Sequence, residues 1–229
     1  NRALYDYTKA YGVPCISGKD SMKNDYIIGE TKISIPPTLL FSTMGKIEDA
    51  RKAVTMDAKK PGDLVYVLGE TREELGGSEW FALHGFTGNN VPKVNAAKAR
   101  KLYRALTGAI DRGLVASCHD CSDGGLGIAL AETAFAGGLG MDLDLSRIPR
   151  EGIERDDYLL FSESQSRFVA TISPESKEEF ENIMAENIIA CIGKITSGKA
   201  FRIAGINGKN IIEEDINNLK KAWQKPLNF

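Results

Sequence analysis

Apolar residues recur along this chain with two different spacings, and each spacing predicts one type of secondary structure. A spacing of three and four residues, which places side chains on one face of a helix, predicts helices over residues 1–12, 95–113 and 126–138. Further helices are expected after Ser78, Ser173 and Asp215, which are polar residues suited to cap a helix start. Short alternating or continuous apolar runs predict strands over Val13 to Ser17, 33–35, Leu39 to Met44, 63–70, 113–118, 141–145, 166–172 and 188–195, and a hairpin around Asn207-Gly208.

Helices and strands therefore mix throughout the chain, which is typical of an α/β or α+β protein with a mixed sheet packed against helices. The polar segment "MDAKKPGD", residues 56–63, contains Pro-Gly and interrupts the apolar pattern. We place the domain boundary there, with a first region over residues 1–57 and a second over residues 61–229.

The overall charge excludes several classes of partner. A formal net charge of −2 argues against a nucleic-acid or membrane surface as the main partner. No apolar run approaches the roughly 18 residues of a membrane-spanning helix, and no basic-then-apolar start indicates a signal peptide, so a cytoplasmic location is expected. The chain opens without Met and inside a helical pattern, so it is expected to be part of a longer protein.

The four cysteines, Cys15, Cys118, Cys121 and Cys191, are interpreted as structural and reduced. Cys118 and Cys121 have a spacing seen in metal sites, but a zinc site needs about four ligands and no second Cys/His pair exists.

Two nucleotide-binding motifs nearly match and fail. Gly18-Lys19 resembles the end of a P-loop, but Gly12 lies one residue too far upstream and Asp20 stands where Ser or Thr is needed. Gly125-x-Gly127 lacks the third glycine of the dinucleotide-binding pattern. Neither a P-loop ATPase nor a Rossmann enzyme is supported.

Three polar clusters interrupt the apolar pattern, and each has two interpretations. The turn from Ser17 to Ser21 is either an exposed polar turn or a phosphate and Mg²⁺ site, since Asp20 is a hard oxygen ligand and Gly18 allows close backbone approach. Residues 119–126 either begin a helix through their Asp and Gly residues or place carboxylates for a metal that bridges phosphates. Residues 161–168 are either a solvated loop or a set of hydrogen-bonding groups for a ribose or an amide.

Four segments in order carry a resemblance to a known family: "VPCISGKDSM", "GETREELGGSEW", "HDCSDGGLGIALAE" and "LFSESQSRFVATI". From about Leu4 to its end, the chain resembles the C-terminal part of the phosphoribosylformylglycinamidine synthases, within the aminoimidazole ribonucleotide synthetase superfamily. The resemblance implies an ATP-dependent C–N ligase of purine biosynthesis. That enzyme converts formylglycinamide ribonucleotide, ATP and glutamine-derived ammonia to formylglycinamidine ribonucleotide, ADP and phosphate.

The resemblance also implies cofactors and partners. The reaction transfers a phosphoryl group from ATP, and phosphoryl transfer depends on Mg²⁺ and on positioned charges. Ammonia comes from a glutaminase subunit or domain, and no glutaminase constellation is present here. The family enzyme has two similar halves, so residues 1–57 are a remnant of the N-terminal-type domain of the second half, and 61–229 are a C-terminal domain. The catalytic histidine lies in the missing N-terminal half, so no catalytic residue is assigned and the isolated chain is expected to be inactive.

Carried over residue by residue, the first cluster is implied to hold a nucleotide. Gly18 and Lys19 are expected at nucleotide phosphates, Asp20 at Mg²⁺, and Ser21 at nucleotide or substrate. Shorter family members have Asn where Lys19 stands, whereas fused members have the Gly-Lys-Asp-Ser found here.

The other two clusters are assigned through the similarity of the two halves. Asp120 is a second metal candidate, and Glu163, Ser164 and Gln165 match a substrate-binding triplet of the first half. Two alternatives stay open: a nucleotide-free structural and assembly module of the same enzyme, or another ATP-using enzyme of the superfamily such as a thiamine-monophosphate kinase or selenophosphate synthetase.

Overall fold

A computed structural model describes residues 1–19, 25–34, 36 and 38–227. The chain forms two compact units, residues 1–51 and residues 52–229. Among the described helices, none combines the length and the apolar character that crossing a lipid bilayer requires.

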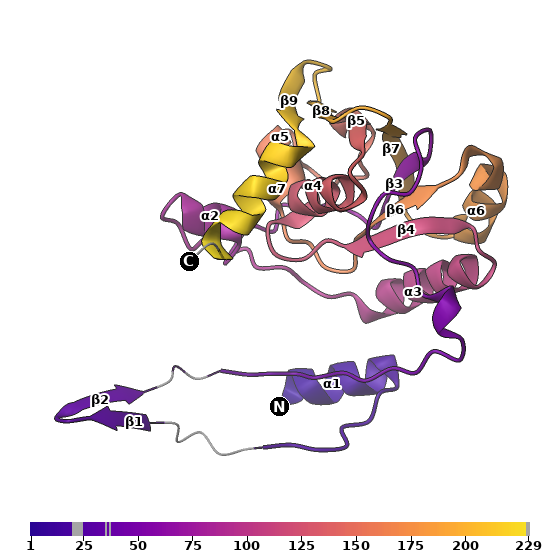
Figure 1. The fold of residues 1–229 in the computed structure, drawn as a ribbon. Helices are drawn as coiled ribbons and strands as arrows, with labels where there is room; N and C mark the ends of the chain where they lie inside the picture. Colours follow the sequence, from indigo (N-terminus) through magenta and orange to yellow (C-terminus); the bar gives the residue numbers. More distant parts are fainter. Residues whose placement is uncertain (20–24, 35, 37, 228–229) are drawn as a thin grey trace. The chain divides into compact units, whose positions relative to one another are not determined.

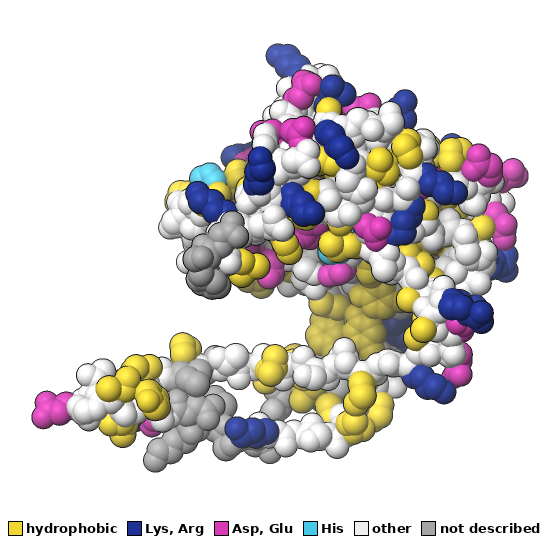
Figure 2. All heavy atoms as spheres, in the orientation of Figure 1, with side chains coloured by type: hydrophobic (Ala, Val, Ile, Leu, Met, Phe, Trp, Pro, Cys, Tyr) yellow, Lys and Arg dark blue, Asp and Glu magenta, His cyan; other side chains and the backbone are white. Residues whose placement is uncertain are grey.

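The described residues of the first unit form an α-helix and a β-hairpin, and a 3₁₀ turn begins near its end (Figure 1). Helix α1, Arg2–Tyr11, ends at Gly12, whose φ of 70° is the left-handed conformation expected of a glycine cap. Strands β1, Asp25–Ile28, and β2, Thr31–Ser34, pair antiparallel. None of the described residues of this unit is buried, and apolar side chains lie on its surface (Figure 2).

Two strand predictions in the first unit are wrong. Neither Val13 to Ser17 nor Leu39 to Met44 forms a strand. An apolar run becomes a strand only when a neighbouring strand takes its backbone N–H and C=O groups, and no described segment does so here. Their side chains are correspondingly exposed, with Ile16 at 82% and Leu40 at 84% of full accessibility.

The second unit is built on a seven-stranded sheet with the order β4-β6-β3-β7-β5-β8-β9. All neighbouring strands pair antiparallel except β5 and β8, which pair parallel. The sheet is therefore mixed, as expected. Its strands are β3 Leu64–Leu68, β4 Val115–Asp120, β5 Gly140–Asp144, β6 Phe168–Ile172, β7 Ile189–Thr196, β8 Ala200–Ala204 and β9 Asn210–Asp215.

Helices cover both faces of this sheet (Figure 1). One face packs against α4, Gly125–Gly137, α5, Asp156–Phe161, and α7, Ile216–Gln224. The other packs against α3, Ala96–Asp111, and α6, Lys177–Met184. The described residues also form the short α2, Glu79–Leu83, and 3₁₀ turns at Leu145–Arg147, Pro174–Ser176 and Lys225–Leu227, while a further 3₁₀ turn, Ala50–Lys52, spans the junction of the two units.

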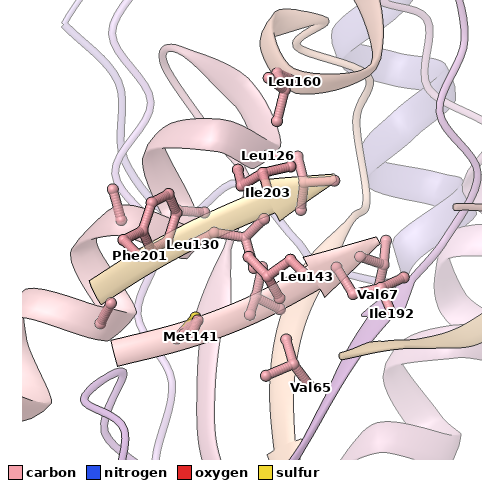
Figure 3. Packing of buried hydrophobic residues seen from close by; sticks show 14 of the residues in the cluster. Val65, Val67, Leu126, Leu130, Met141, Leu143, Leu160, Ile192, Phe201 and Ile203 are labelled. Carbon is pink, nitrogen blue, oxygen red and sulfur yellow. The ribbon is translucent and has the colours of Figure 1, made fainter. Parts of the chain in front are cut away.

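The two hydrophobic clusters follow from strand alternation. On β3, Val65 and Val67 enter the cluster on the α4 side, whereas Tyr66 and Leu68 enter the cluster on the α3 side. Figure 3 shows the first cluster, where Val65 and Val67 lie among side chains that include Leu143 of β5. Because both faces of β3 are buried, its sequence reads as a continuous apolar run.

We expected the boundary between the units within residues 56–63. In the structure the units divide a few residues earlier, between Arg51 and Lys52. Ala58 is buried in the core of the second unit, and its N–H donates to the carbonyl of Thr133 in α4 over 3.0 Å. The N–H of Cys118 donates to the carbonyl of Thr55 over 3.1 Å. Polar composition marked this segment as a linker, but its backbone is bound to β4 and α4.

Candidate functional site

The second polar cluster lies where β4 ends and α4 begins. Asp120, the last residue of β4, is exposed, and the Ser122 hydroxyl donates a hydrogen bond to its Oδ2. This hydrogen bond is the main cause that holds the pKa of Asp120 below its usual value, so the carboxylate is charged at neutral pH. Gly124 and Gly125 follow with φ of 76° and 66°, and these left-handed conformations make the tight entry into α4.

His119 lies between two carboxylates. Its Nδ1 is 3.5 Å from Oδ1 of Asp120, and its Nε2 is 2.7 Å from Oε2 of Glu132 on α4. The other oxygen of Glu132 accepts a hydrogen bond from the indole Nε1–H of Trp223 on α7 over 3.0 Å. The strand end, α4 and α7 are thus connected by side chains.

The third polar cluster is a packed connection rather than a solvated loop. Oε1 of Glu163 accepts hydrogen bonds from the backbone N–H groups of Gly124 at 2.9 Å and of Glu79 at 3.0 Å. These two residues stand at the starts of α4 and α2, where backbone N–H groups lack helical partners and favour a negative charge. The Glu163 carboxylate therefore joins two helix N-termini.

Two neighbours of Glu163 differ in their surroundings. Ser164 is buried, and its hydroxyl accepts from the N–H of Arg72 at 3.0 Å and lies 3.2 Å from the carbonyl of the same residue. Gln165 is exposed, and its side-chain amide donates to the carbonyl of Glu163 over 3.2 Å. The hydroxyl of Ser164 is engaged within the fold, whereas the amide of Gln165 is open to solvent.

Arg167 is the residue of this cluster that sequence reasoning missed. It is 1% exposed, and its guanidinium donates to the carbonyls of Ser164 (2.9 Å) and Ser162 and to the Thr71 hydroxyl (2.8 Å). Burial lowers the pKa of Arg167. The signal in the sequence is a cation directly before the apolar run "FVATI", a position that becomes buried when the run enters a central strand.

The arrangement fits a hard cation only in part. No three His, Cys, Asp or Glu side chains within the described residues gather into a metal-binding group. Mg²⁺ is usually held by one or two carboxylates together with water and substrate phosphates, and the exposed, charged Asp120 suits that role. A cavity of about 610 Å³ between α3 and α6 is on the face of the sheet opposite α4, and none of these residues lines it.

The first polar cluster belongs to the other unit. Gly18 and Lys19 are exposed there, and the expected metal ligand Asp20 and its neighbour Ser21 lie outside the described residues.

Two of the four cysteines are held protonated by burial. All four are free thiols, and burial raises the pKa of Cys118 to about 12 and that of Cys121 to about 11. These two thiols stay protonated at neutral pH, as structural cysteines do. Cys15, in contrast, is exposed, because the apolar run around it forms no strand.

Comparison with known proteins places this geometry in context. Residues 60–206 match the family described as AIR synthase related protein, C-terminal domain. The phosphoribosylformylglycinamidine synthase subunit PurL of Methanocaldococcus jannaschii is 32% identical over 97% of this chain and 30% of its own length. The subunit of the same name from Alkaliphilus metalliredigens is 37% identical over 98% of this chain and 29% of its own length. This chain therefore spans about 30% of the length of these curated relatives.

Solved structures share the fold. PurL of Thermotoga maritima, in a complex with FGAR, superimposes with a TM-score of 0.66 at 22% identity, covering 74% of this chain and 30% of that one. The hydrogenase maturation protein HypE of E. coli gives a TM-score of 0.52 at 19% identity, covering 71% of this chain and 51% of that one. The mixed α/β class expected from the sequence is confirmed.

Proposed function

Since this chain belongs to the family of the AIR synthase related protein, C-terminal domain, we propose that it is the C-terminal region of a phosphoribosylformylglycinamidine synthase. Its curated relatives carry that name along 93% or more of this chain. The synthase forms a C–N bond at the expense of ATP, converting formylglycinamide ribonucleotide and ammonia to formylglycinamidine ribonucleotide. The remaining length of the synthase supplies the catalytic groups, a glutaminase subunit or domain supplies ammonia, and the reaction takes place in the cytoplasm.

In this proposal the chain contributes charge and positioning at a nucleotide site. Asp20 and Asp120 would each offer a carboxylate to Mg²⁺, which offsets the charge of the phosphates when it is bound. The nucleotide would be contacted by Gly18, Lys19 and Ser21. The substrate would be contacted by Ser21, Glu163, Ser164 and Gln165. PurL of Thermotoga maritima has been solved in complexes with ATP, ADP and FGAR, which supports a nucleotide and FGAR as the ligand classes.

One observation carries the metal part of the proposal. Asp120 is the charged carboxylate at the end of β4 that keeps its side chain 63% exposed, with a hydroxyl as its hydrogen-bond partner.

The contacts of Glu163 and Ser164 favour a second candidate function, a structural and assembly module without nucleotide. Glu163 binds the N–H groups of two helix starts, and Ser164 binds the backbone of Arg72. Side chains engaged in this way stabilise the unit without any ligand.

Calorimetric titration with Mg-ADP separates the two functions. The chain is compared with Asp20→Ala, Asp120→Ala and, as a matched control, Asp111→Ala, which removes an exposed carboxylate at the end of α3. A nucleotide site predicts that both of the first two changes weaken binding at least about tenfold while Asp111→Ala leaves it unchanged. A folded chain that binds no Mg-ADP would overturn the nucleotide site and leave the structural module.

A further inference from the structure

Helices α3 and α6 enclose a groove on the face of the sheet opposite α4. The two helices pack against each other there (Figure 1), and a cavity of about 610 Å³ opens between them. Ion pairs connect Lys101 with Glu186 at 2.8 Å and Arg112 with Glu179 at 3.2 Å. The earlier residue of α3 pairs with the later residue of the α6 segment, so the helices run antiparallel. We call this cavity the α3–α6 groove.

The α3–α6 groove carries more positive charge than its own residues neutralise. Three of its nine lining residues are the cations Arg100, Lys101 and Arg104, whereas Glu186 is the one acidic residue of the lining. Glu186 is already paired with Lys101. Arg104 is exposed, and within the part of the chain that the structure describes no residue forms an ion pair or a hydrogen bond with its side chain. A bound anion would supply the missing negative charge.

The spacing of the two arginines suits a phosphate group. Arg100 and Arg104 are four residues apart on α3, so they lie on one face of the helix, one turn from each other. A guanidinium presents its N–H groups as a planar fork, which matches the oxygens of a phosphate. Ala97 and Ala105 lie on the same face, and their small side chains leave the space between the arginines and α6 open.

The size of the groove favours an organic phosphate over a bare ion. A volume of about 610 Å³ lies in the range of roughly 300–1,000 Å³ that is typical of small-molecule sites. The wall that follows from α6 contains the amides of Asn182 and Asn187, which can donate and accept hydrogen bonds, and the apolar Ile183. These groups suit the polar organic part of a ligand whose phosphate meets the arginines.

We propose that the α3–α6 groove binds a phosphate monoester of nucleotide size without a metal ion. Arg100 and Arg104 hold the phosphate, and the amides of Asn182 and Asn187 contact the organic part. A hollow lined by arginine forks favours such a molecule over an acidic protein segment, which would meet a flatter surface. The site lies on the other face of the sheet from Asp120, so it does not rest on the proposed function.

Calorimetric titration of the chain with adenosine monophosphate (AMP) in the presence of EDTA tests the proposal. EDTA removes Mg²⁺, so a metal-dependent site does not contribute to the heat. Adenosine lacks the phosphate and should bind at least about tenfold more weakly than AMP, because the charge-assisted hydrogen bonds are lost. Octaglutamate, which represents an acidic protein segment, should also bind more weakly than AMP.

Three substitutions locate the binding. Arg100→Gln and Arg104→Gln should each weaken AMP binding at least about tenfold, while glutamine preserves the helix. Glu186→Gln should strengthen it about threefold, because it removes the acidic residue of the lining and releases Lys101. Arg112→Gln is the matched control: it makes the same change at the end of α3, outside the groove, and should leave AMP binding unchanged.

Each outcome supports or overturns the site. A folded chain that binds no AMP, or that binds AMP and adenosine equally, would overturn the proposal. AMP binding that is unchanged in Arg104→Gln would place the ligand elsewhere, and tighter binding of octaglutamate would replace the small molecule by an acidic partner. If Arg100→Gln does not fold, Arg104→Gln and Glu186→Gln give the same answer through opposite changes in affinity. A chain that binds AMP in EDTA but fails the Mg-ADP titration with its Asp120→Ala comparison would keep the groove and lose the proposed nucleotide site.

Discussion

The carboxylate of Glu163 accepts a hydrogen bond from the backbone N–H of Gly124 over 2.9 Å, although 39 residues separate them in the chain. The same oxygen accepts from the N–H of Glu79. A negative charge thus lies at the starts of α2 and α4, and it fixes how the segment before β6 meets both helices.

Replacing Glu163 by Ala is expected to lower the free energy of unfolding by about 2 kcal/mol, because two N–H groups lose their acceptor and two helix starts lose a favourable charge. Glu163→Gln should cost about half as much, since its oxygen can still accept. Urea denaturation measures both values. Gln165→Ala, an exposed neighbour, is the control and should change stability by less than about 0.5 kcal/mol. Equal stability of Glu163→Ala and the parent chain would contradict a structural role for this carboxylate.

Arg167→Met should destabilise the second unit by about 2–4 kcal/mol. The substitution keeps a long side chain but leaves the Thr71 hydroxyl and two buried carbonyls without their donor. Removal of a buried cation offsets part of this loss. Chemical denaturation measures the free energy of unfolding of each variant. The stability of Arg167→Lys is expected to lie between that of the parent chain and that of Arg167→Met. A fully stable Arg167→Met would show that desolvation of the guanidinium costs as much as its hydrogen bonds contribute.

Gly→Ala substitutions at two positions distinguish the cost of backbone strain from the cost of a steric clash. Gly125 and Gly208 have φ of 66° and 75°, so an L side chain is strained at either position. A Cβ at Gly125 would also clash with the carbonyl oxygen of Ser162, whereas a Cβ at Gly208 meets nothing within 4 Å. We expect Gly208→Ala to cost about 1 kcal/mol and Gly125→Ala to cost clearly more, as measured by thermal or urea unfolding. Similar losses of stability in both variants would show that the backbone at Ser162 moves away and relieves the clash.

Asp63 makes stability depend on pH. Its side chain is buried, its Oδ2 has no hydrogen-bond partner in the part of the chain that the structure describes, and burial raises its pKa above the usual value. The folded state therefore binds the proton more tightly than the unfolded state, so this group's contribution to stability is fully present below a pH of about 4. That contribution is lost as the pH rises through the raised pKa of the folded state.

Asp63→Asn removes this dependence. We expect the stability of the variant relative to the parent chain to increase from about pH 4 toward neutral pH, which urea denaturation over that range measures. A constant difference across the range would contradict a raised pKa at Asp63.

Local sequence predicts most of the second unit. Its caps are visible in the sequence, and the side chains of Asn95 and Asp215 accept hydrogen bonds at the starts of α3 and α7 as expected. In the first unit, Gly12 ends α1 as predicted, but the apolar run from Val13 to Ser17 does not become a strand. Helix ends depend on neighbours in sequence, whereas a strand depends on a partner that the run itself does not specify.

The candidate site is less predictable from the sequence, because its side chains also depend on partners that lie far away along the chain. The polar residues at 119–126 and 161–168 are evident, and Asp120 is exposed at a strand end as its position suggests. The burial of Ser162 and Ser164 is not evident, because their hydroxyls bind the backbone of Arg72, about 90 residues away. The roles proposed for Asp20, Asp120 and Glu163 remain predictions for the titrations described above.

The position of β3 has a consequence for synthesis on the ribosome. β3 lies between β6 and β7, so both of its hydrogen-bonding edges wait for strands that are translated about 100 residues later. At roughly 5–20 residues per second, the nascent apolar segment spends on the order of 5–20 s without either partner. Nascent chains that stop before residue 168 should therefore be sensitive to protease and bound by chaperones, and protection should arise only after β6 and β7 have left the exit tunnel.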